Sequence, residues 1–482
     1  MTKRKPAPPA PDPLERYAMH FDPLFAKLNQ REGFRRYLEG LLLPAERNKT
    51  LTALATTEPI VGAHQPRAQA LQWFLSESDW DPARVNTRRL EVLCTDPLTA
   101  SDAHGVLVID EHGDRKWGTK TAHIGKQYLA NLGKIDNGVV SVTSLWADEQ
   151  VYYPLEVEPY TPGHHFAGGK RDPQFRTKLT IALELVERAV TTSIPFRAVV
   201  ADSFYGEDEG FKAELRQLNV GYVLALKPSH AWLHWEGEIG ALWQVAEGAG
   251  WQDADAPGAW VKVERTFRDG HVEVWWALEV AAGPYGPEQA QRAVVVTTDP
   301  KALPDRSTWY LVTNVPVPGA QRAREAGALP AADLAEVVRL YGLRMWVEQS
   351  YKQVKYALGW SQYQVRSDVA IRRHWQLVCC AFSFCWWHHS QTAGDDAVLD
   401  RVHGEQLAEP SARTEVGEWK KKQHRTTVPT AGVLAGGAQT GPGVAGAMDH
   451  AGALLARVVR SPATRTASAA ELGVAGTRDL PL

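Results

Sequence analysis

Two stretches near the N-terminus have the apolar period of amphipathic helices. In each, apolar side chains recur at i, i+3, i+4 and i+7: Phe21, Leu24, Phe25 and Leu28, then Phe34, Tyr37, Leu38 and Leu41. A third helix is expected near 67–75, and a fourth after Asp81-Pro82, a favourable N-cap and first-turn pair, as far as about Leu93. The pattern predicts an all-α domain over 13–98, preceded by a basic, Pro-rich arm at 1–12 that we expect to be disordered.

From about residue 99 the pattern changes to short apolar and β-branched runs, which are typical of strands. Strands are expected near 104–110, 138–147, 150–157, 197–202 and 221–227, with helices near 174–193 and 207–218. This order predicts an α/β fold with a mixed sheet, whose parallel part is made by right-handed crossovers. Further strands are expected in a β-rich insertion at about 229–315, where Arg268-Asp269-Gly270 would turn a hairpin.

Two of the strand candidates end in an aspartate. Asp110 closes the run 106–110, and Asp202 closes the run 197–202. In open α/β sheets, the reactive groups gather beyond the carboxyl ends of such strands. A single aspartate in this position more often caps the following turn or helix, and Asp202 could cap the helix near 207–218.

A third acid belongs to a helical stretch with an unusual polar stripe. Tyr341, Arg344, Glu348 and Lys355 are spaced by nearly whole helical turns, beside an apolar stripe of Leu340, Leu343, Val347, Val354 and Leu358. Alone, this pattern would favour an ordinary amphipathic helix with an i,i+4 pair. Together, the three acids could instead hold two hard divalent cations through oxygen ligands.

These residues resemble those of the DDE transposases of bacterial insertion sequences. The Tyr341-x2-Arg344-x3-Glu348-x6-Lys355 helix is similar to the Y-R-E-K helix of the IS-four-like group. The residues around each acid are most similar to the IS-seven-zero-one branch of that group: Val-Ile-Asp110-Glu-His-Gly, Gly125-Lys-Gln-Tyr128, Leu132-Gly-Lys-Ile-Asp136-Asn, Val-Val-Ala-Asp202-Ser-Phe-Tyr-Gly and Trp346-Val-Glu348-Gln-Ser-Tyr. The resemblance extends over roughly 21–387.

The resemblance implies a ribonuclease-H-like catalytic domain over 99–390, in which Asp110, Asp202 and Glu348 converge. These acids would hold two Mg²⁺ ions, for which Mn²⁺ could substitute, about 3.5–4 Å apart with the scissile phosphate between them. Arg344 and Lys355 would neutralise DNA phosphates, and Tyr341 would position the backbone. The implied function is to bind the terminal inverted repeats of an insertion sequence, to cleave DNA at its ends and to join them to target DNA. Two ends require at least a dimer on DNA.

A candidate for recognition of the terminal repeats lies in the N-terminal domain. Arg84, Arg88 and Arg89 fall on the fourth expected helix, which could form a helix-turn-helix with the helix before it. Three arginines are also common on a solvated helix face. The net charge is only −3, so double-stranded DNA must be bound by local basic patches and salt should weaken the binding.

The remaining composition fits a reducing cytosol, and the resemblance implies a cytoplasmic, nucleoid-associated bacterial protein. Four cysteines without a CxxC pair predict neither a disulfide framework nor a zinc site. The longest apolar run, Leu377–Trp387, is shorter than the ~20 residues needed to span a bilayer. The segment 391–482 is rich in Gly, Ala, Thr and Ser, which predicts a low-complexity, largely disordered tail with a helix near 451–459. This unusual tail raises the hypothesis of an altered C-terminus and a defective element.

Three other functions fit parts of the pattern. Another ribonuclease-H-like nuclease would share the acids but would not need the insertion or the Y-R-E-K helix. A decayed or domesticated transposase would act only as a DNA-binding repressor, which the tail favours and the intact acids oppose. A carboxylate-pair glycosidase needs two acids and has no use for the cation-flanked helix.

Overall fold

The strands of the chain form one large mixed sheet in this computed structural model, which describes residues 5–43, 48–55, 66–233, 239–267, 271–280 and 289–406, without the side chains of 232–239 and 393–406. The strand order is β2-β3-β1-β5-β6-β12-β11-β10-β9, with β4 also paired to β3. Its first half comprises β1 (Val106–Arg115), β2 (Gly125–Leu129), β3 (Lys134–Ala147), β4 (Tyr152–Tyr160), β5 (Ala198–Ala201) and β6 (Tyr222–Ala225). β1, β5 and β6 are parallel to one another, as the expected crossovers require.

The second half of the sheet comes from the expected β-rich insertion. It comprises β9 (Val261–Thr266), β10 (Val272–Val280), β11 (Arg292–Thr297) and β12 (Thr308–Thr313). β12 pairs with β6, so these strands continue the catalytic sheet instead of forming a separate subdomain. β7 (Ala231–Leu233) and β8 (Ile239–Ala241) form a small second sheet. The expected turn at 268–270 lies outside the described residues.

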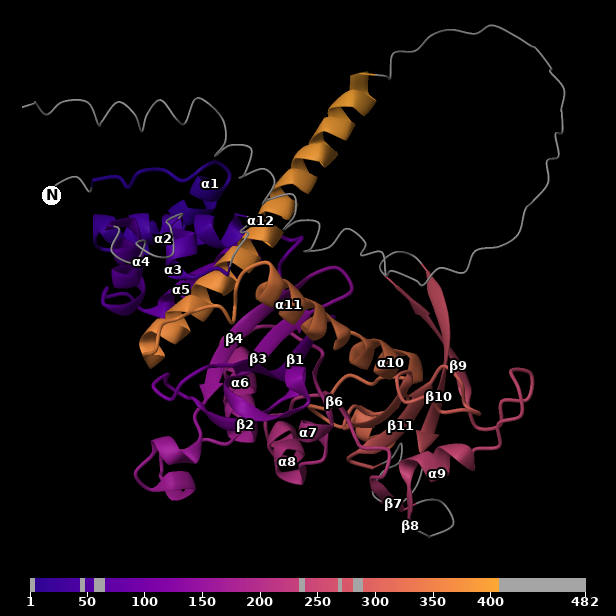
Figure 1. Cartoon of the computed structure of the whole chain (residues 1–482). Coiled ribbons are helices and arrows are strands. Elements are labelled where there is room, and N and C mark those ends of the chain that lie inside the picture. Colours follow the sequence, from indigo (N-terminus) through magenta and orange to yellow (C-terminus); the bar gives the residue numbers. More distant parts are fainter. Residues whose placement is uncertain are drawn as a thin grey trace, which may run out of the picture.

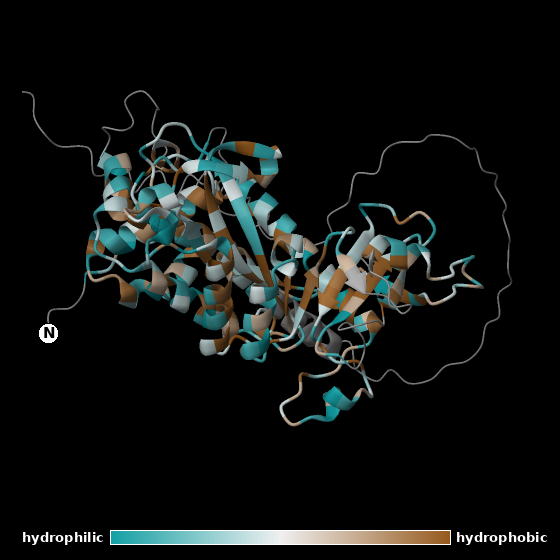
Figure 2. Cartoon of the chain, turned by 90° about the horizontal axis from the view of Figure 1, so that it is seen from below, coloured by the Kyte–Doolittle hydropathy of each residue, from teal (hydrophilic) through white to brown (hydrophobic). Residues whose placement is uncertain are grey.

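Helices cover both faces of the large sheet (Figure 1). On one side lie α6 (Lys178–Thr191), α7 (Ser203–Gly206) and α8 (Glu209–Gln217), and α9 (Leu242–Glu247) follows β8. On the other side lie α10 (Leu334–Gly342), α11 (Met345–Tyr356) and the first part of α12 (Asp368–Gln406). The central strands are wholly buried, and apolar residues are concentrated along them (Figure 2). This double cover explains the continuous apolar runs in the sequence.

The N-terminal region is helical, as expected, but it shares its core with α12. It comprises α1 (Leu14–Met19), α2 (Leu28–Leu42), α3 (Leu51–Leu54), α4 (Pro66–Ser76) and α5 (Pro82–Cys94). Tyr37 Oη hydrogen-bonds His374 Nδ1 of α12 at 2.8 Å, and the Tyr17 ring lies 5.5 Å from that of Phe384. Trp386 of the same helix donates to the Tyr152 carbonyl of β4 at 2.7 Å. α12 therefore joins the helical region to the sheet.

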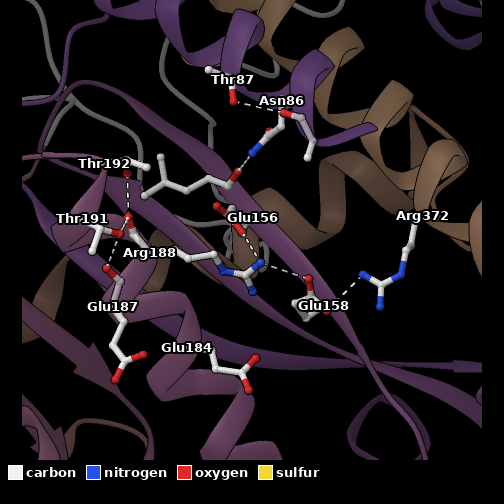
Figure 3. A network of polar contacts seen from close by, with 12 residues as sticks. Asn86, Thr87, Glu156, Glu158, Glu184, Glu187, Arg188, Thr191, Thr192 and Arg372 are labelled. Carbon is white, nitrogen blue, oxygen red and sulfur yellow. Dashed lines mark hydrogen bonds and ion pairs between the residues drawn. The ribbon is translucent and has the colours of Figure 1, made fainter. Parts of the chain in front are cut away.

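A buried ionic cluster fastens α6 and α12 to β4 (Figure 3). Glu158, only 8% exposed, accepts from Arg372 of α12 at 3.0 Å and from Arg188 of α6 at 3.2 Å. Arg176, just before α6, lies 3.3 Å from the same carboxylate. Burial acts to raise the pKa of Glu158, but these three arginines outweigh it and lower the pKa. The cluster holds the two layers of helices in place around the end of β4.

Four expectations about the elements need correction. The apolar stretch at 21–28 forms only a 3-10 turn, Asp22–Leu24, and Phe25 after it is extended. β1 does not end at Asp110 but runs to Arg115. β2 was not expected. α12 continues to Gln406, into the segment expected to be disordered. The helix expected near 451–459 lies outside the described residues, and in the part that is described no helix is long and apolar enough to cross a bilayer.

Candidate active site

Asp110 lies in the middle of β1, where one neighbouring strand ends. β1 pairs with β5 only as far as Val108, opposite Val200. It stays paired with β3 as far as Arg115, which is why the strand continues past Asp110. Asp110 therefore stands just beyond the edge of the parallel pairing, which is the place where open α/β sheets carry reactive groups.

Asp202 follows β5 directly and caps the short helix α7. Its Oδ1 accepts a hydrogen bond from the Phe204 amide at 3.0 Å. The alternative that Asp202 is a helix cap is thus confirmed, although for α7 and not for the longer helix expected at 207–218. That helix, α8, is capped by Asp208, which accepts from the Phe211 amide at 2.7 Å. Capping engages Oδ1 of Asp202 without removing the carboxylate from the strand end.

The two aspartates influence each other electrostatically. Burial raises the pKa of Asp110 to about 7, with Arg344 lowering it and Asp202 raising it further. The Glu111 amide donates to Asp110 Oδ1 at 2.8 Å and also lowers this pKa. A carboxylate beside a second one in a buried position holds its proton more tightly, unless a cation compensates. The expected meeting of Asp110 and Asp202 at neighbouring strand ends agrees with this mutual influence.

Arg344 is the cation at this pair of acids. Its Nη2 lies 3.4 Å from Asp110 Oδ2, and its side chain is 18% exposed. Burial acts to lower the pKa of Arg344, but Asp110, Tyr341, Asp202 and Glu348 together raise it. The guanidinium therefore lies in the negative field of all three acids.

The Y-R-E-K residues do not lie on one continuous helix. α10 ends at Gly342, and α11 begins at Met345 with Arg344 at its N-cap. A Cβ at position 342 would lie too close to the guanidinium of Arg265 from β9, so a larger residue here would require that side chain to shift. Tyr341, the last residue before this glycine, packs its ring 5.1 Å from Trp309 of β12. The break therefore falls inside the expected polar stripe, between Tyr341 and Glu348.

Glu348 lies in the first turn of α11 and is exposed. It interacts electrostatically with Arg344 and Tyr341. Across the described ranges, no group of three or more His, Cys, Asp or Glu side chains is arranged to hold a metal ion. The structure thus brings together Asp110, Asp202 and Arg344, and it leaves Glu348 outside a three-carboxylate site.

Two further polar residues, His112 and Asp114, lie on the same side of β1 as Asp110, and neither was proposed as a site residue from the sequence. His112 Nε2 lies 2.9 Å from Asp114 Oδ1, and both side chains are buried. The His112 ring packs 4.7 Å from that of Tyr351 on α11. Two effects act on the pKa of Lys355, the last residue of the Y-R-E-K set. Burial is the larger effect and lowers this pKa, and the negative charge of Asp114 acts to raise it. Asp110, His112 and Asp114 are spaced at i, i+2 and i+4, so on a strand their side chains share one face. This spacing is the sequence signal that could have predicted a polar face on β1.

The N-terminal arginines divide into one buried and two accessible residues. Arg89 is fully buried: its Nη1 donates to Ser383 Oγ of α12 at 2.9 Å, and its Nη2 donates to the Leu155 carbonyl of β4 at 2.8 Å. The prediction that Arg89 contacts DNA is therefore wrong in this arrangement, because its donors hold the core together. Arg84 is exposed, and Arg88 lies 3.3 Å from Glu91 with 39% of its side chain exposed.

The comparison with known proteins agrees with the geometry. A family model described as DDE superfamily endonuclease matches residues 21–247, a stretch that includes Asp110 and Asp202 and ends before α11. A protein of Microchaete diplosiphon, named as a probable transposase for insertion sequence element IS701, is 32% identical over 368 residues. The match covers 76% of this chain and 85% of that protein.

The likeness extends well beyond a shared motif, because it takes in most of both chains. It also agrees with the mixed sheet, which is of the ribonuclease-H-like kind, and with the two aspartates at its parallel edge. The chain belongs to the IS701-type transposases of the DDE endonuclease superfamily.

Proposed function

We propose that this protein binds the terminal inverted repeats of its insertion sequence, cleaves DNA at those ends and joins them to target DNA by phosphoryl transfer. Asp110, Asp202 and Glu348 would be the catalytic carboxylates. The proposal rests on one observation. Asp110 and Asp202 lie at the edge of the parallel strands, where Asp202 raises the pKa of Asp110, and Arg344 lies beside Asp110. The family assignment agrees with DNA as the substrate and opposes the glycosidase alternative.

The donor chemistry of the aspartate pair fits a divalent cation. Carboxylate oxygens are the ligands that Mg²⁺ and Mn²⁺ prefer. Burial and Asp202 raise the pKa of Asp110, which is the situation that a bound cation would relieve. Glu348 is exposed and outside ligand geometry here. The proposal therefore requires that the Glu348 side chain turns toward the pair when metal and DNA bind, while α11 keeps its contact with the sheet through Tyr351 and Thr143.

Two bound ions would supply a nucleophile at neutral pH and stabilise the leaving oxygen. The chain's own residues would do the rest. Arg344, released from Asp110, could grip a phosphate in bidentate fashion. Lys355, on the same side of α11, would add positive charge near the cut. The Tyr341 ring packs against Trp309 of β12. Held in place by the strands β9–β12, Tyr341 would position the DNA backbone.

The proposal is tested with the full chain and a fragment that carries the element's ends, in Mg²⁺, in Mn²⁺ and with EDTA. Asp110→Asn, Asp202→Asn and Glu348→Gln should each abolish metal-dependent cleavage and leave binding to the fragment in gel-shift assays largely intact. Glu264→Gln, at an exposed position of β9, is the matched control and should cleave normally. Full cleavage by any one of the three variants would remove that residue from the site.

The same assay separates an active transposase from a repressor. A wild-type protein that binds the terminal fragment but never cuts it, in either metal, would support the decayed form. Joining of two ends also implies at least a dimer on DNA. Mass photometry of the protein with and without the fragment should show two copies on paired ends.

A further inference from the structure

An open groove with basic and aromatic walls lies beside the aspartate pair. β2 and β4 both pair with β3. The groove forms where β2 and the end of β4 come together, next to the start of α6. The residues that line it are Lys126, Gln127, Tyr128, Tyr160, Pro162, Gly163, His164, Phe166, Ala167, Gly169, Lys170 and Lys178. No acidic side chain is among them, so the groove is complementary to a polyanion.

The positive charge of the groove is available for a ligand. Lys126 and Lys170 are exposed, and among the described residues neither forms an ion pair. Lys126 and Tyr128 point to the same side of β2, because alternate residues of a strand share a face. Lys178 is less exposed, since its Nζ lies 2.6 Å from Glu111 Oε2.

Lys178 connects the groove to the aspartate pair by two contacts. Its partner Glu111 is the residue that follows Asp110 on β1. Its Nζ also lies 5.7 Å from the ring centre of Phe204, whose amide donates to Asp202. Each contact leads to a neighbour of an aspartate: Glu111 follows Asp110 on β1 and points to the opposite face of the sheet, and Phe204 follows Asp202 by two residues.

The aromatic walls favour an unpaired strand over a duplex. Tyr128 is 54% exposed, and Tyr160 and Phe166 are half-buried in the wall. Bases stack on such rings only where their faces are free, as they are in single-stranded DNA. In a duplex the neighbouring base pairs cover these faces.

We propose that this groove binds the single DNA strand that extends from the scissile phosphate, with Lys126 and Lys170 on its phosphates and Tyr128 under a base. The inference rests on the proposed function, because Asp110 and Asp202 would define where that strand begins. The alternative is that Lys126 only protects the edge strand β2 from pairing with another sheet, which would make its charge irrelevant to DNA.

The test uses the full chain with Asp110→Asn, so that the probe stays uncut, and a fluorescent single-stranded 20-mer in a salt titration. Lys126→Ala with Lys170→Ala should weaken binding about tenfold and reduce the slope of log K against log salt by about 1.4, because each phosphate contact adds about 0.7. Tyr128→Ala should weaken binding at least fivefold, while Tyr128→Phe should bind normally. Lys301→Ala, at an exposed position in the turn between β11 and β12, is the control and should change nothing.

Unchanged affinity and slope in the double lysine variant would overturn the inference. An equal loss for a blunt duplex of the same length would overturn the assignment to an unpaired strand. Failure of the proposed function would look different: aspartate variants that still cleave would leave the single-strand binding of the groove untouched. Circular dichroism of each variant excludes misfolding as the cause of a loss.

Discussion

The hydroxyl groups of Tyr351 and Thr143 lie 2.5 Å apart, and Thr143 also donates to the Asp110 carbonyl at 3.3 Å. A threonine hydroxyl has one proton, so Tyr351 must donate to Thr143. Thr143 of β3 is also directly opposite Asp110 of β1 in the sheet. This chain of two hydrogen bonds fixes α11, which carries Glu348, against the strand that carries Asp110.

Tyr351→Phe should therefore loosen the site without unfolding the protein. The ring would still pack on His112, and the lost hydrogen bond should cost about 0.5–1.5 kcal/mol of stability. We expect a lower cleavage rate with unchanged DNA affinity. Thr143→Val breaks the same contact from the other side, so the double variant should be no worse than either single one. Additive rate losses would show that the two residues act separately.

Metal affinity should depend on pH through Asp110. Its pKa is raised to about 7, chiefly by burial, so below pH 7 a proton competes with the cation for this carboxylate. Mg²⁺ affinity measured by calorimetry should rise with pH up to about 7 and then level off. In the metal-free protein, the contribution of Asp110 to folding stability falls as the pH rises, whereas the Mg²⁺ affinity increases. A raised folded-state pKa favours the protonated form, so this contribution is present below the unfolded value of about 3.9 and is lost as the pH rises through 7.

The charges around Asp110 allow a two-sided test of this pKa. Arg344→Gln removes the cation that lowers it, so the midpoint should move upward. Asp202→Asn removes the charge that raises it, so the midpoint should move downward. Carboxyl-detected NMR of the metal-free protein measures both shifts. Movement in the same direction in both variants would contradict the arrangement described here.

Glu158→Gln should destabilise the fold strongly, because it leaves Arg372, Arg188 and Arg176 without their buried carboxylate. Because each arginine keeps a second carboxylate partner, Asp368, Glu156 or Glu184, we expect a cost of about 1.5–3 kcal/mol, that of a lost hydrogen bond to a charged group. The lowered pKa of Glu158 gives a stability contribution that is present above its unfolded value of about 4.3 and is lost as the pH falls through the folded value. Urea unfolding at pH 7 and at pH 4 measures both effects. Glu187→Gln, on α6, should be nearly neutral at either pH.

The two kinds of arginine on α5 should behave differently. Arg89→Ala should lower the unfolding midpoint, since it removes buried hydrogen bonds to Ser383 Oγ, to the Leu155 carbonyl and to Asn86 Oδ1. Arg84→Ala should leave the midpoint unchanged, and it should weaken binding to the terminal repeats if α5 reads DNA. Equal repeat binding by wild type and Arg84→Ala would end the assignment of this helix to recognition.

The sequence pattern predicted most elements because the spacing of apolar residues in a segment follows from which of its side chains are buried. The strands around Val142, Val199 and Val223 have buried centres, and each was expected within a few residues of its bounds. The prediction failed where polar residues continue a strand: β1 runs through Asp110, His112 and Asp114 because β3 satisfies its backbone. Periodicity within one segment contains no information on such a partner.

The sequence singled out some residues that the fold brings together, but it did not give their geometry. Asp110, Asp202 and Arg344 are close together, as their positions at strand ends and on a helix suggested. The break between α10 and α11 could not be read from the local pattern, because the expected polar and apolar stripes continue through it. Arg89 was misassigned for a similar reason, because its partner Ser383 lies 294 residues away in the chain.

That separation also bears on how the protein is made. Tyr17, Tyr37 and Arg89 each have a partner on α12, so the first helices cannot complete their core until Trp387 has left the ribosome. Until then, apolar surface that belongs under α12 stays open to chaperones. The nascent chain thus reaches its finished form late, after the whole catalytic sheet has been synthesised.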